Sequence, residues 1–334
     1  MKASKIRAGE SESPTLSSFV DLNPKPEDFR GALLQGFCEV PKKIPSKFFY
    51  DDYGSELFEE ICKLEEYYPT RTEIGILQEH REEIADLIGE TSHLIELGSG
   101  ASKKIRILLN ELQGLSRYTA VDISRDFLIQ SAEKLASDYP YLDIAAVCAD
   151  YTKDFYVPDP PSAGEIRRVA FFPGSTIGNF DQTQAELFLT TLGRILGPES
   201  GLLIGIDLEK ESRIIEAAYN DLEGITAKFN LNLLNRANRE IGTDFDVSSF
   251  RHQAVYVEPL SRIEMRLVSE KTQSVQVEEE LFDFATDEYI LTEISQKFNI
   301  EEFKCLAARS GYKHVKAWSD EKNFFGVHFL VAED

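Results

Sequence analysis

Residues 94–104, LIELGSGASKK, contain an apolar run, a glycine-rich turn and the start of a helical pattern. Gly98 and Gly100 allow the backbone to turn tightly and to approach a ligand closely. Unpaired N–H groups at the start of the following helix suit a phosphate or a carboxylate. Lys103 stands where the dinucleotide-binding motif has its third glycine, so that motif is incomplete. The stretch predicts the first strand, turn and helix of a ligand-binding α/β fold.

Four further apolar runs follow this stretch and alternate with helical patterns. They are residues 118–124 (YTAVDIS), 142–150 (LDIAAVCAD), 168–175 (RVAFFPGS) and 201–208 (GLLIGIDL). This alternation predicts a parallel, doubly wound sheet. The runs are rich in apolar residues and barely alternate with polar ones, which is typical of strands covered on both faces. We therefore expect a Rossmann-like α/β core over residues 75–209.

The sequence changes character after Glu209. A helical pattern at 211–242 precedes strand-like runs at 252–259, 262–270 and 274–284. This is too much sequence for a loop, so we expect an inserted α+β substrate-binding subdomain. The expected divisions are a disordered tail at 1–20, the N-terminal part of the subdomain at 21–74, its inserted part at 210–297, and a return to the core at 298–334 through a helix and an antiparallel strand pair.

Composition and charge exclude several kinds of function. The 334-residue chain has a formal net charge of −22, and so negative a surface repels the phosphate backbone of nucleic acids. No run of about 18 apolar residues could span a membrane, and the N-terminus lacks the apolar segment of a secretory signal. Four cysteines and five histidines are scattered, which favours neither disulfides nor a metal site. We expect a cytoplasmic monomer without nucleic-acid, membrane or metal partners.

Acidic residues stand at the ends of three successive predicted strands. Glu96 precedes the glycine loop, Asp122 ends the second strand, and Asp150 ends the third beside Tyr151. Ligands of such sheets bind beyond the carboxyl ends of the strands. Each acid alone could equally be a helix cap. Together they favour S-adenosylmethionine, with its amino acid end in the loop, its ribose on Asp122 and its adenine beside Asp150.

The fourth predicted strand ends in a turn without charged residues. Residues 169–180 read VAFFPGSTIGNF, and in this architecture the tip of that strand lies next to the transferred group. Backbone groups with the Thr176 and Asn179 side chains could hold a small zwitterion there. A plain strand-to-helix turn would explain the glycines but not the whole cluster. We expect a tip without charge, because a nearby carboxylate would favour a protonated, unreactive amine.

Six stretches together resemble one known family. They are 67–73 (YYPTRTE), 96–104 (ELGSGASKK), 174–179 (GSTIGN), 217–230 (AAYNDLEGITAKFN), 262–265 (RIEM) and 291–298 (LTEISQKF). In this order they resemble the histidine-specific Nα-methyltransferases of ergothioneine biosynthesis, class I S-adenosylmethionine enzymes that trimethylate the α-amine of histidine to hercynine. The resemblance runs from about Pro41 to the C-terminus. It implies S-adenosylmethionine as cofactor and L-histidine as substrate.

The resemblance also implies roles for individual residues. On the cofactor side it matches Gly98, Lys104, Asp122, Asp150 and Tyr151, beside the loop residues Glu96 and Gly100. The implied catalytic residues are Tyr50 and Tyr67, which should face the substrate. We expect either water or their hydroxyls to relay the proton of the α-ammonium. The implied substrate contacts are Phe58 in the pocket wall, Gly174 and Thr176 at the α-amino group, Asn179 and Tyr219 at the carboxylate, and Glu293, Ser295 and Met265 around the imidazole.

The implied contacts of Glu293 and Ser295 with the imidazole have some support that does not depend on the family resemblance. Glu293 and Ser295 are two residues apart in a strand-like run, so their side chains share one face. A carboxylate and a hydroxyl suit a ring with one donor and one acceptor nitrogen, although a solvated edge strand is the alternative. Other functions left open are methylation of another α-amine such as that of tryptophan, a nicotinamide-dependent oxidoreductase, and a non-catalytic S-adenosylmethionine-binding scaffold.

Overall fold

The computed structural model describes residues 16–22, 24, 28–100, 103–161 and 166–333. Its main sheet has the strand order β1-β5-β4-β3-β6-β7-β14-β13. Neighbouring strands from β1 to β7 run parallel, whereas β14 is antiparallel to both β7 and β13. The strands are β1 (Ser18–Asp21), β3 (His93–Leu97), β4 (Arg117–Asp122), β5 (Ile144–Cys148), β6 (Arg168–Phe172), β7 (Gly201–Asp207), β13 (Tyr312–Ser319) and β14 (Phe325–Ala332).

Helices cover both faces of this sheet, because β3 to β7 are apolar on both sides. One face packs against α3 (Tyr68–Glu79), α4 (Arg81–Ile88), α5 (Lys103–Glu111) and α6 (Arg125–Asp138). The other packs against α7 (Gln182–Leu196) and α10 (Ile300–Arg309). The predicted doubly wound α/β fold is thus confirmed, including the C-terminal antiparallel pair. We call this sheet with its six helices the main lobe.

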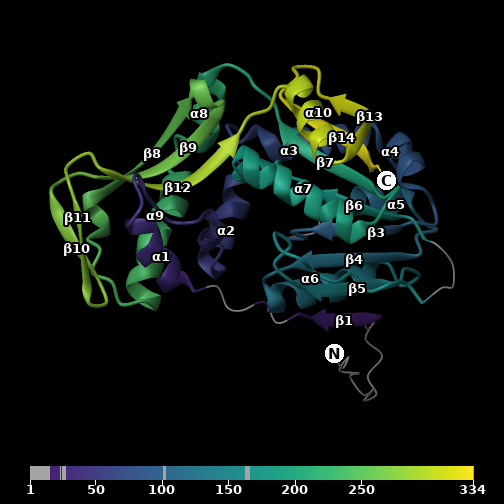
Figure 1. Cartoon of the computed structure of the whole chain (residues 1–334), viewed down its shortest axis with the longest axis horizontal. Helices are drawn as coiled ribbons and strands as arrows, with labels where there is room; N and C mark the ends of the chain where they lie inside the picture. The colour runs from purple at the N-terminus through teal and green to yellow at the C-terminus, as the bar shows by residue number, and fades with distance from the viewer. Residues whose placement is uncertain (1–15, 23, 25–27, 101–102, 162–165, 334) are drawn as a thin grey trace, which may run out of the picture.

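The remaining elements form a small lobe with its own core (Figure 1). Its sheet has the order β2-β12-β9-β8, and a β10–β11 hairpin adjoins it. Phe49 stacks on Phe229 at 4.4 Å, so N-terminal and inserted residues share one core. The elements are α1 (Phe29–Phe37), β2 (Lys42–Lys43), η1 (Ser46–Phe49), α2 (Asp52–Ile61), α8 (Ser212–Tyr219), α9 (Ile225–Glu240), β8 (Phe250–Val257), β9 (Arg262–Ser269), β10 (Gln273–Val277), β11 (Glu280–Phe284) and β12 (Tyr289–Gln296).

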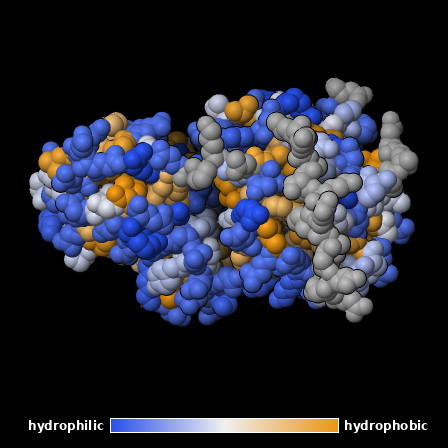
Figure 2. Space-filling view, turned by 90° about the horizontal axis from the view of Figure 1, so that it is seen from below, coloured by the Kyte–Doolittle hydropathy of each residue, from blue (hydrophilic) through white to orange (hydrophobic). Residues whose placement is uncertain are grey.

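The end of β12 connects the two lobes. In Figure 1, β12 points from the small lobe towards the main lobe. Just beyond it, the Phe298 N–H donates to Asp207 O at 2.8 Å, and the Glu209 N–H donates to Phe298 O at 3.0 Å. The end of β12 is therefore bonded to the end of β7. Figure 2 shows the two lobes as separate masses with a hollow between them.

Three details differ from the sequence-based expectations. Residues 18–20 were expected in the tail, but they belong to β1, which pairs with β5 and extends the sheet; residues 1–15 lie outside the described residues. The helical pattern at 211–242 is two helices, because Asp221 accepts the N–H groups of Ile225 and Thr226 and starts a new helix at α9. Helix α3 crosses the boundary expected at residue 74 and packs on the main lobe.

Within the described ranges, no helix is long and apolar enough to cross a membrane. In the same part of the chain, no group of three or more His, Cys, Asp or Glu residues could hold a metal ion.

Candidate active site

The glycine loop after β3 has the geometry that a bound cofactor requires. Gly98 and Gly100 have φ values of +71° and +42°, a region that other residues rarely adopt. A Cβ at Gly98 would lie 3.6 Å from the Tyr151 ring. Tyr151 itself packs edge-on against Phe172 and Phe188. The loop and the residue predicted to lie beside adenine therefore adjoin each other, whereas loop residues 101–102 lie outside the described residues.

The three strand-end acids lie in different environments. Burial raises the pKa of Asp122, while the N–H of Ser124 donates to its carboxylate at 2.9 Å. Burial acts to raise the pKa of Asp150, but hydrogen bonds from Lys153 and Thr152 hold this pKa below its usual value. Glu96 is fully buried beneath the loop and accepts a 2.6 Å hydrogen bond from Tyr118. Its burial raises its pKa to about 8.

The tip of β6 is not free of charge, which corrects the expectation from sequence. The Gly174 N–H donates to both carboxylate oxygens of Glu73, at 2.9 and 3.0 Å. Glu73 comes from α3, is completely buried, and forms an ion pair with Lys104. The carboxylate is thus neutralised by Lys104, one of the predicted cofactor contacts. Glu73 is the last residue of the 67–73 stretch, the one signal that could have identified it.

The turn after β6 packs against β12. Ser175 adopts φ +56°, and its Oγ accepts the Asp207 N–H at 2.8 Å. The Thr176 hydroxyl donates to Pro173 O at 2.8 Å and so stabilises its own turn. A Cβ at Gly178 would lie 2.9 Å from the carbonyl oxygen of Gln296. The short helix η2 (Thr176–Asn179) therefore reaches β12 only because residue 178 is glycine.

Four of the predicted substrate residues form a continuous aromatic cluster. The ring of Phe58 lies 5.5 Å from that of Tyr50 and 6.3 Å from that of Tyr67, which lies 6.2 Å from Tyr219. Tyr50 keeps 42% of its surface exposed, but enough protein surrounds it for burial to raise its pKa. Burial, with smaller contributions from neighbours that include Glu293, raises the pKa of Tyr50 and of Tyr67 well above the usual value. Both residues are therefore neutral phenols near pH 7.

Glu293 and Ser295 lie on β12 in the register that the sequence predicted. Glu293 is opposite Met265 on β9, just after a bulge in the strand pairing. Burial raises the pKa of Glu293 to about 7, and Lys297 opposes that rise. Glu293 also contributes to the pKa shifts of Tyr50, Tyr67 and Tyr219. The carboxylate therefore lies near the tyrosines of the aromatic cluster.

A buried lysine that we did not predict joins two of the predicted residues. Lys297 is 1% exposed, and its Nζ donates to Ser295 Oγ at 2.8 Å and to Tyr219 OH at 3.1 Å. Asp207 at the end of β7 lies 2.8 Å from the same nitrogen. Lys297 continues the period-two row of Glu293 and Ser295. That spacing could have identified it.

Asp207 holds a second lysine. Lys210 donates to Asp207 at 2.5 Å and to the Tyr68 hydroxyl at 2.7 Å. Burial acts to raise the pKa of Asp207, but Lys297 and Lys210 hold it below its usual value. Burial acts to lower the pKa of Lys297, but Asp207 and Tyr219 raise it above its usual value. Asp207 and Lys297 therefore stay charged at neutral pH.

The backbone of Tyr219 is fixed from behind by a buried polar chain. The Asn230 amide contacts His252 Nδ1 at 2.8 Å, and His252 Nε2 contacts Tyr219 O at 2.8 Å. Thr292 donates to Asn230 Oδ1 at 2.7 Å. Burial lowers the pKa of His252, so its ring is neutral and its Nε2–H donates to Tyr219.

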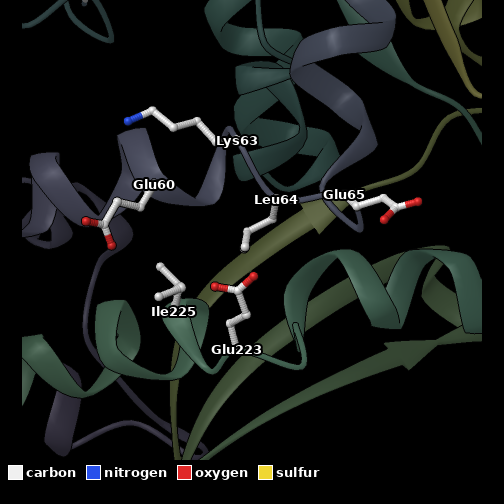
Figure 3. Close-up of a pocket in the computed structure, with 6 residues that line it drawn as sticks. All are labelled: Glu60, Lys63, Leu64, Glu65, Glu223 and Ile225. Atoms are coloured by element: carbon white, nitrogen blue, oxygen red, sulfur yellow. The ribbon is translucent and has the colours of Figure 1, made fainter.

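A separate pocket of about 260 Å³ lies where the loop after α2 meets the loop before α9. Figure 3 shows the Glu223 side chain directed towards Leu64 across this gap. None of its lining residues is a predicted site residue; they are Glu60, Lys63, Leu64, Glu65, Glu223 and Ile225. These two loops lead into Tyr67 and away from Tyr219. The pocket therefore marks the outer side of the aromatic cluster.

The parallel sheet, the left-handed glycine loop and the acids at successive strand ends define a class I S-adenosylmethionine-dependent methyltransferase. Within that class, the chain belongs to the family of histidine-specific, S-adenosylmethionine-dependent methyltransferases, which residues 29–332 match. It is an N-methyltransferase enzyme, and S-adenosylmethionine is its methyl donor.

Two bacterial proteins and one fungal protein illustrate the relationship. The chain is 37% identical over 322 residues to a histidine N-alpha-methyltransferase of Mycolicibacterium smegmatis, covering 95% of this chain and 99% of the relative. It is 38% identical over 303 residues to that of Mycobacterium tuberculosis, covering 89% and 93%. An L-tryptophan methyltransferase of Psilocybe serbica is 26% identical over 325 residues, covering 88% and 90%.

Proposed function

We propose that the protein transfers three methyl groups from S-adenosylmethionine to the α-amino group of L-histidine. The product would be hercynine, and the reaction the first step of ergothioneine biosynthesis. The observation that carries this proposal is the position of Glu293 and Ser295 on one face of β12. Lys297 links Ser295 to Tyr219, and Glu293 lies near enough to Tyr50, Tyr67 and Tyr219 to affect their pKa values. The names of the two mycobacterial relatives support the same substrate.

The described residues fit the methyl donor. The positive φ values at Gly98 and Gly100 leave room for its amino acid end, while Asp122, Asp150 and Tyr151 adjoin the loop at the carboxyl ends of the strands. When bound, S-adenosylmethionine supplies a methyl group that its sulfonium already activates. The protein must then position a neutral amine in line with that methyl group. Positioning of this kind can supply up to about 7–11 kcal/mol of the barrier.

The proton of the α-ammonium has to leave before each transfer. Tyr50 and Tyr67 are neutral phenols, so they would relay a proton rather than accept one as phenolates. Glu73, the carboxylate at the β6 tip, is bonded to Gly174 and Lys104. Its charge is thus balanced, and it does not favour the protonated amine as a free carboxylate would.

The aromatic cluster suits a product that carries a fixed positive charge. Each methylation adds bulk, and the third leaves a quaternary ammonium. Faces of Tyr50, Phe58 and Tyr67 can stabilise such a cation by about 0.5–2 kcal/mol each through cation–π contacts. Tyr50 is 42% exposed, so its side chain is not enclosed on every side and the site can accommodate this growth.

The test is to incubate the purified protein with S-adenosylmethionine and each of the twenty amino acids separately, and to follow product masses. Histidine gaining three methyl groups while the others stay inert is the expected result. Methylation of tryptophan instead would favour the alternative substrate that the Psilocybe relative's name suggests. Binding of S-adenosylmethionine without methylation of any amino acid would support the scaffold alternative.

We further propose that the protein acts as a cytoplasmic monomer without nucleic-acid or membrane partners. The net charge of −22 supports the absence of a nucleic-acid partner. Light scattering at micromolar concentration should give the mass of one chain, and a dimer mass would contradict the proposal.

A further inference from the structure

Lys297 has no hydrogen left to offer a substrate. An ammonium group has three N–H donors, and those of Lys297 meet Ser295 Oγ at 2.8 Å, Tyr219 OH at 3.1 Å and Asp207 Oδ2 at 2.8 Å. The side chain is also closed to solvent, with 1% exposure. Lys297 can therefore act on a bound molecule only through the two hydroxyls and through the electrostatic effect of its charge.

Lys297 shares its carboxylate partner with a second lysine. Asp207 is the carboxylate that it contacts, and Lys210 contacts the same carboxylate. The two lysines share this one carboxylate, so Asp207 alone does not balance both. Asp320 also acts on Lys210, whose pKa is lowered to about 8 by burial, with a smaller contribution from Lys297. Tyr68 and Tyr219 complete this cluster as neutral phenols. Glu293 is the acidic group on the ring-facing row of β12.

Glu293 and Ser295, which we call the ring site, therefore offer different groups to a bound ring: an acceptor at the Glu293 end and a donor at the Ser295 end. Glu293 offers a hydrogen-bond acceptor at one end. At the other, Ser295 accepts a hydrogen bond from Lys297. Its own hydrogen can go to Tyr219 in the free protein, and the hydroxyl can rotate to donate it to a bound ring instead. A neutral imidazole has one N–H and one unprotonated nitrogen, which match these ends. An imidazolium would present a second N–H and a positive charge towards the Lys297 end, in surroundings where charges are weakly screened.

We propose that Lys297 is a positioning residue that determines which form of the substrate binds: acting through Ser295, it makes the ring site accept the neutral imidazole and reject the imidazolium. This inference rests on the proposed function, because it takes histidine as the substrate. Lys297 balances the attraction that Glu293 alone would exert on a cationic ring.

The first test needs only the unmodified protein. Histidine with ¹⁵N-labelled ring nitrogens is bound in the presence of S-adenosylhomocysteine, which prevents turnover, and its nitrogen shifts are recorded at pH 6. About three quarters of free histidine rings carry both protons at that pH. We expect the bound ring to show one protonated and one unprotonated nitrogen. A bound ring with both nitrogens protonated would overturn the inference.

The second test uses Lys297→Met with Lys210→Met as the matched control. Lys210 contacts the same Asp207 but neither Ser295 nor Tyr219. The readout is kcat/KM at pH 6 and pH 8 for histidine and for 1,2,4-triazolylalanine, whose ring stays neutral. In the unmodified protein, kcat/KM for histidine should fall about fourfold more between pH 8 and pH 6 than kcat/KM for 1,2,4-triazolylalanine does. Lys297→Met should bring the two decreases in kcat/KM within about twofold of each other. Lys210→Met removes one charge of the cluster but keeps the Lys297 bonds to Ser295 and Tyr219, so it should leave a difference of more than twofold.

The outcomes separate this inference from the proposed function. If the unmodified protein neither binds nor methylates histidine, the proposed function fails, and this inference fails with it. If histidine is methylated but the fourfold difference is absent, or persists in Lys297→Met, only the role of Lys297 is wrong. Should Lys297→Met not fold, the ring-nitrogen measurement on the unmodified protein decides.

Discussion

The buried carboxylate of Glu73 receives the backbone N–H of Gly174, with its two oxygens 3.0 and 2.9 Å from that nitrogen. This bond ties α3 to the tip of β6, where the transferred group is expected. Gly205 on β7 leaves the space for it, because a Cβ there would lie 2.1 Å from Glu73 Oε1. A single side chain thus sets the position of the turn that carries Thr176 and Asn179.

Replacing Glu73 should weaken both stability and catalysis. Glu73→Ala leaves the Gly174 N–H and Lys104 without this partner, and an unsatisfied buried group costs about 1–3 kcal/mol. We expect the free energy of unfolding in urea to fall by that amount and kcat/KM to fall at least tenfold. Glu79→Gln, on the exposed part of the same helix, should change unfolding by less than about 0.5 kcal/mol. Equal effects of the two changes would contradict this role.

Enlarging Gly178 should separate the β6 turn from β12. The added methyl group of Gly178→Ala would meet Gln296 O at 2.9 Å, and overpacking of this kind costs about 1–3 kcal/mol. We expect a rise of about tenfold in KM for histidine, with a lower melting temperature. Gly75→Ala is the matched change, since nothing lies within 4 Å of its added methyl group, and it should stabilise α3 by about 0.5–1 kcal/mol. An unchanged KM in Gly178→Ala would refute this account of the turn.

Glu293 should lower the stability of the free enzyme at high pH. Its folded pKa of about 7 lies above the unfolded value of about 4.3, so the folded state binds more protons between these values. Stability therefore falls as the pH rises from about 4.3 to 7 and is level above that. Glu293→Gln removes this pH-dependent loss of stability. The variant should be about 3–4 kcal/mol more stable than the unmodified protein at pH 8, relative to any difference between the two proteins at pH 4.

Denaturant unfolding at the two pH values measures this difference. Exposed Glu279→Gln serves as control and should show no pH-dependent gain. The stabilised Glu293→Gln should also bind histidine more weakly, because the ring loses its carboxylate acceptor. A Glu293→Gln protein with no such gain at pH 8 would show that burial does not shift this group.

Removing both candidate relay hydroxyls should slow the reaction while leaving binding largely intact. Proton transfer by a positioned group contributes about 10²–10⁴-fold. We expect kcat of the Tyr50→Phe, Tyr67→Phe double variant to fall about 10²-fold, with KM for histidine within about threefold. Tyr53→Phe, which removes an exposed hydroxyl from α2, should behave as the unmodified protein. Full trimethylation rates in the double variant would show that other groups remove the proton.

The parallel sheet could be predicted because its strands are continuous apolar runs and its acids stand at strand ends. Edge strand β1 could not, since four residues without a helical or glycine signal resemble a tail. The break between α8 and α9 was missed because Asp221 terminates one amphipathic pattern and starts another in nearly the same phase.

Some residues of the candidate site could likewise be predicted from the sequence, and others could not. Glu293 and Ser295 follow from strand periodicity, and Tyr50, Tyr67 and Tyr219 followed only from the family resemblance. Their assigned roles are predictions that the experiments above test. Glu73, Asp207 and Lys297 were missed because charged residues are expected on the surface. Their burial depends on partners that are distant in the chain.

The pairing of β2 with β12 has a consequence for how the chain acquires its structure during synthesis. Lys42 and Lys43 pair with Ile290 and Leu291, and β14 must insert between β7 and β13. Neither lobe can therefore be completed before nearly the whole polypeptide has left the ribosome. Until α9 has been synthesised, Phe49 lacks the Phe229 ring that it stacks on, so the nascent chain should depend on chaperones that shield apolar segments.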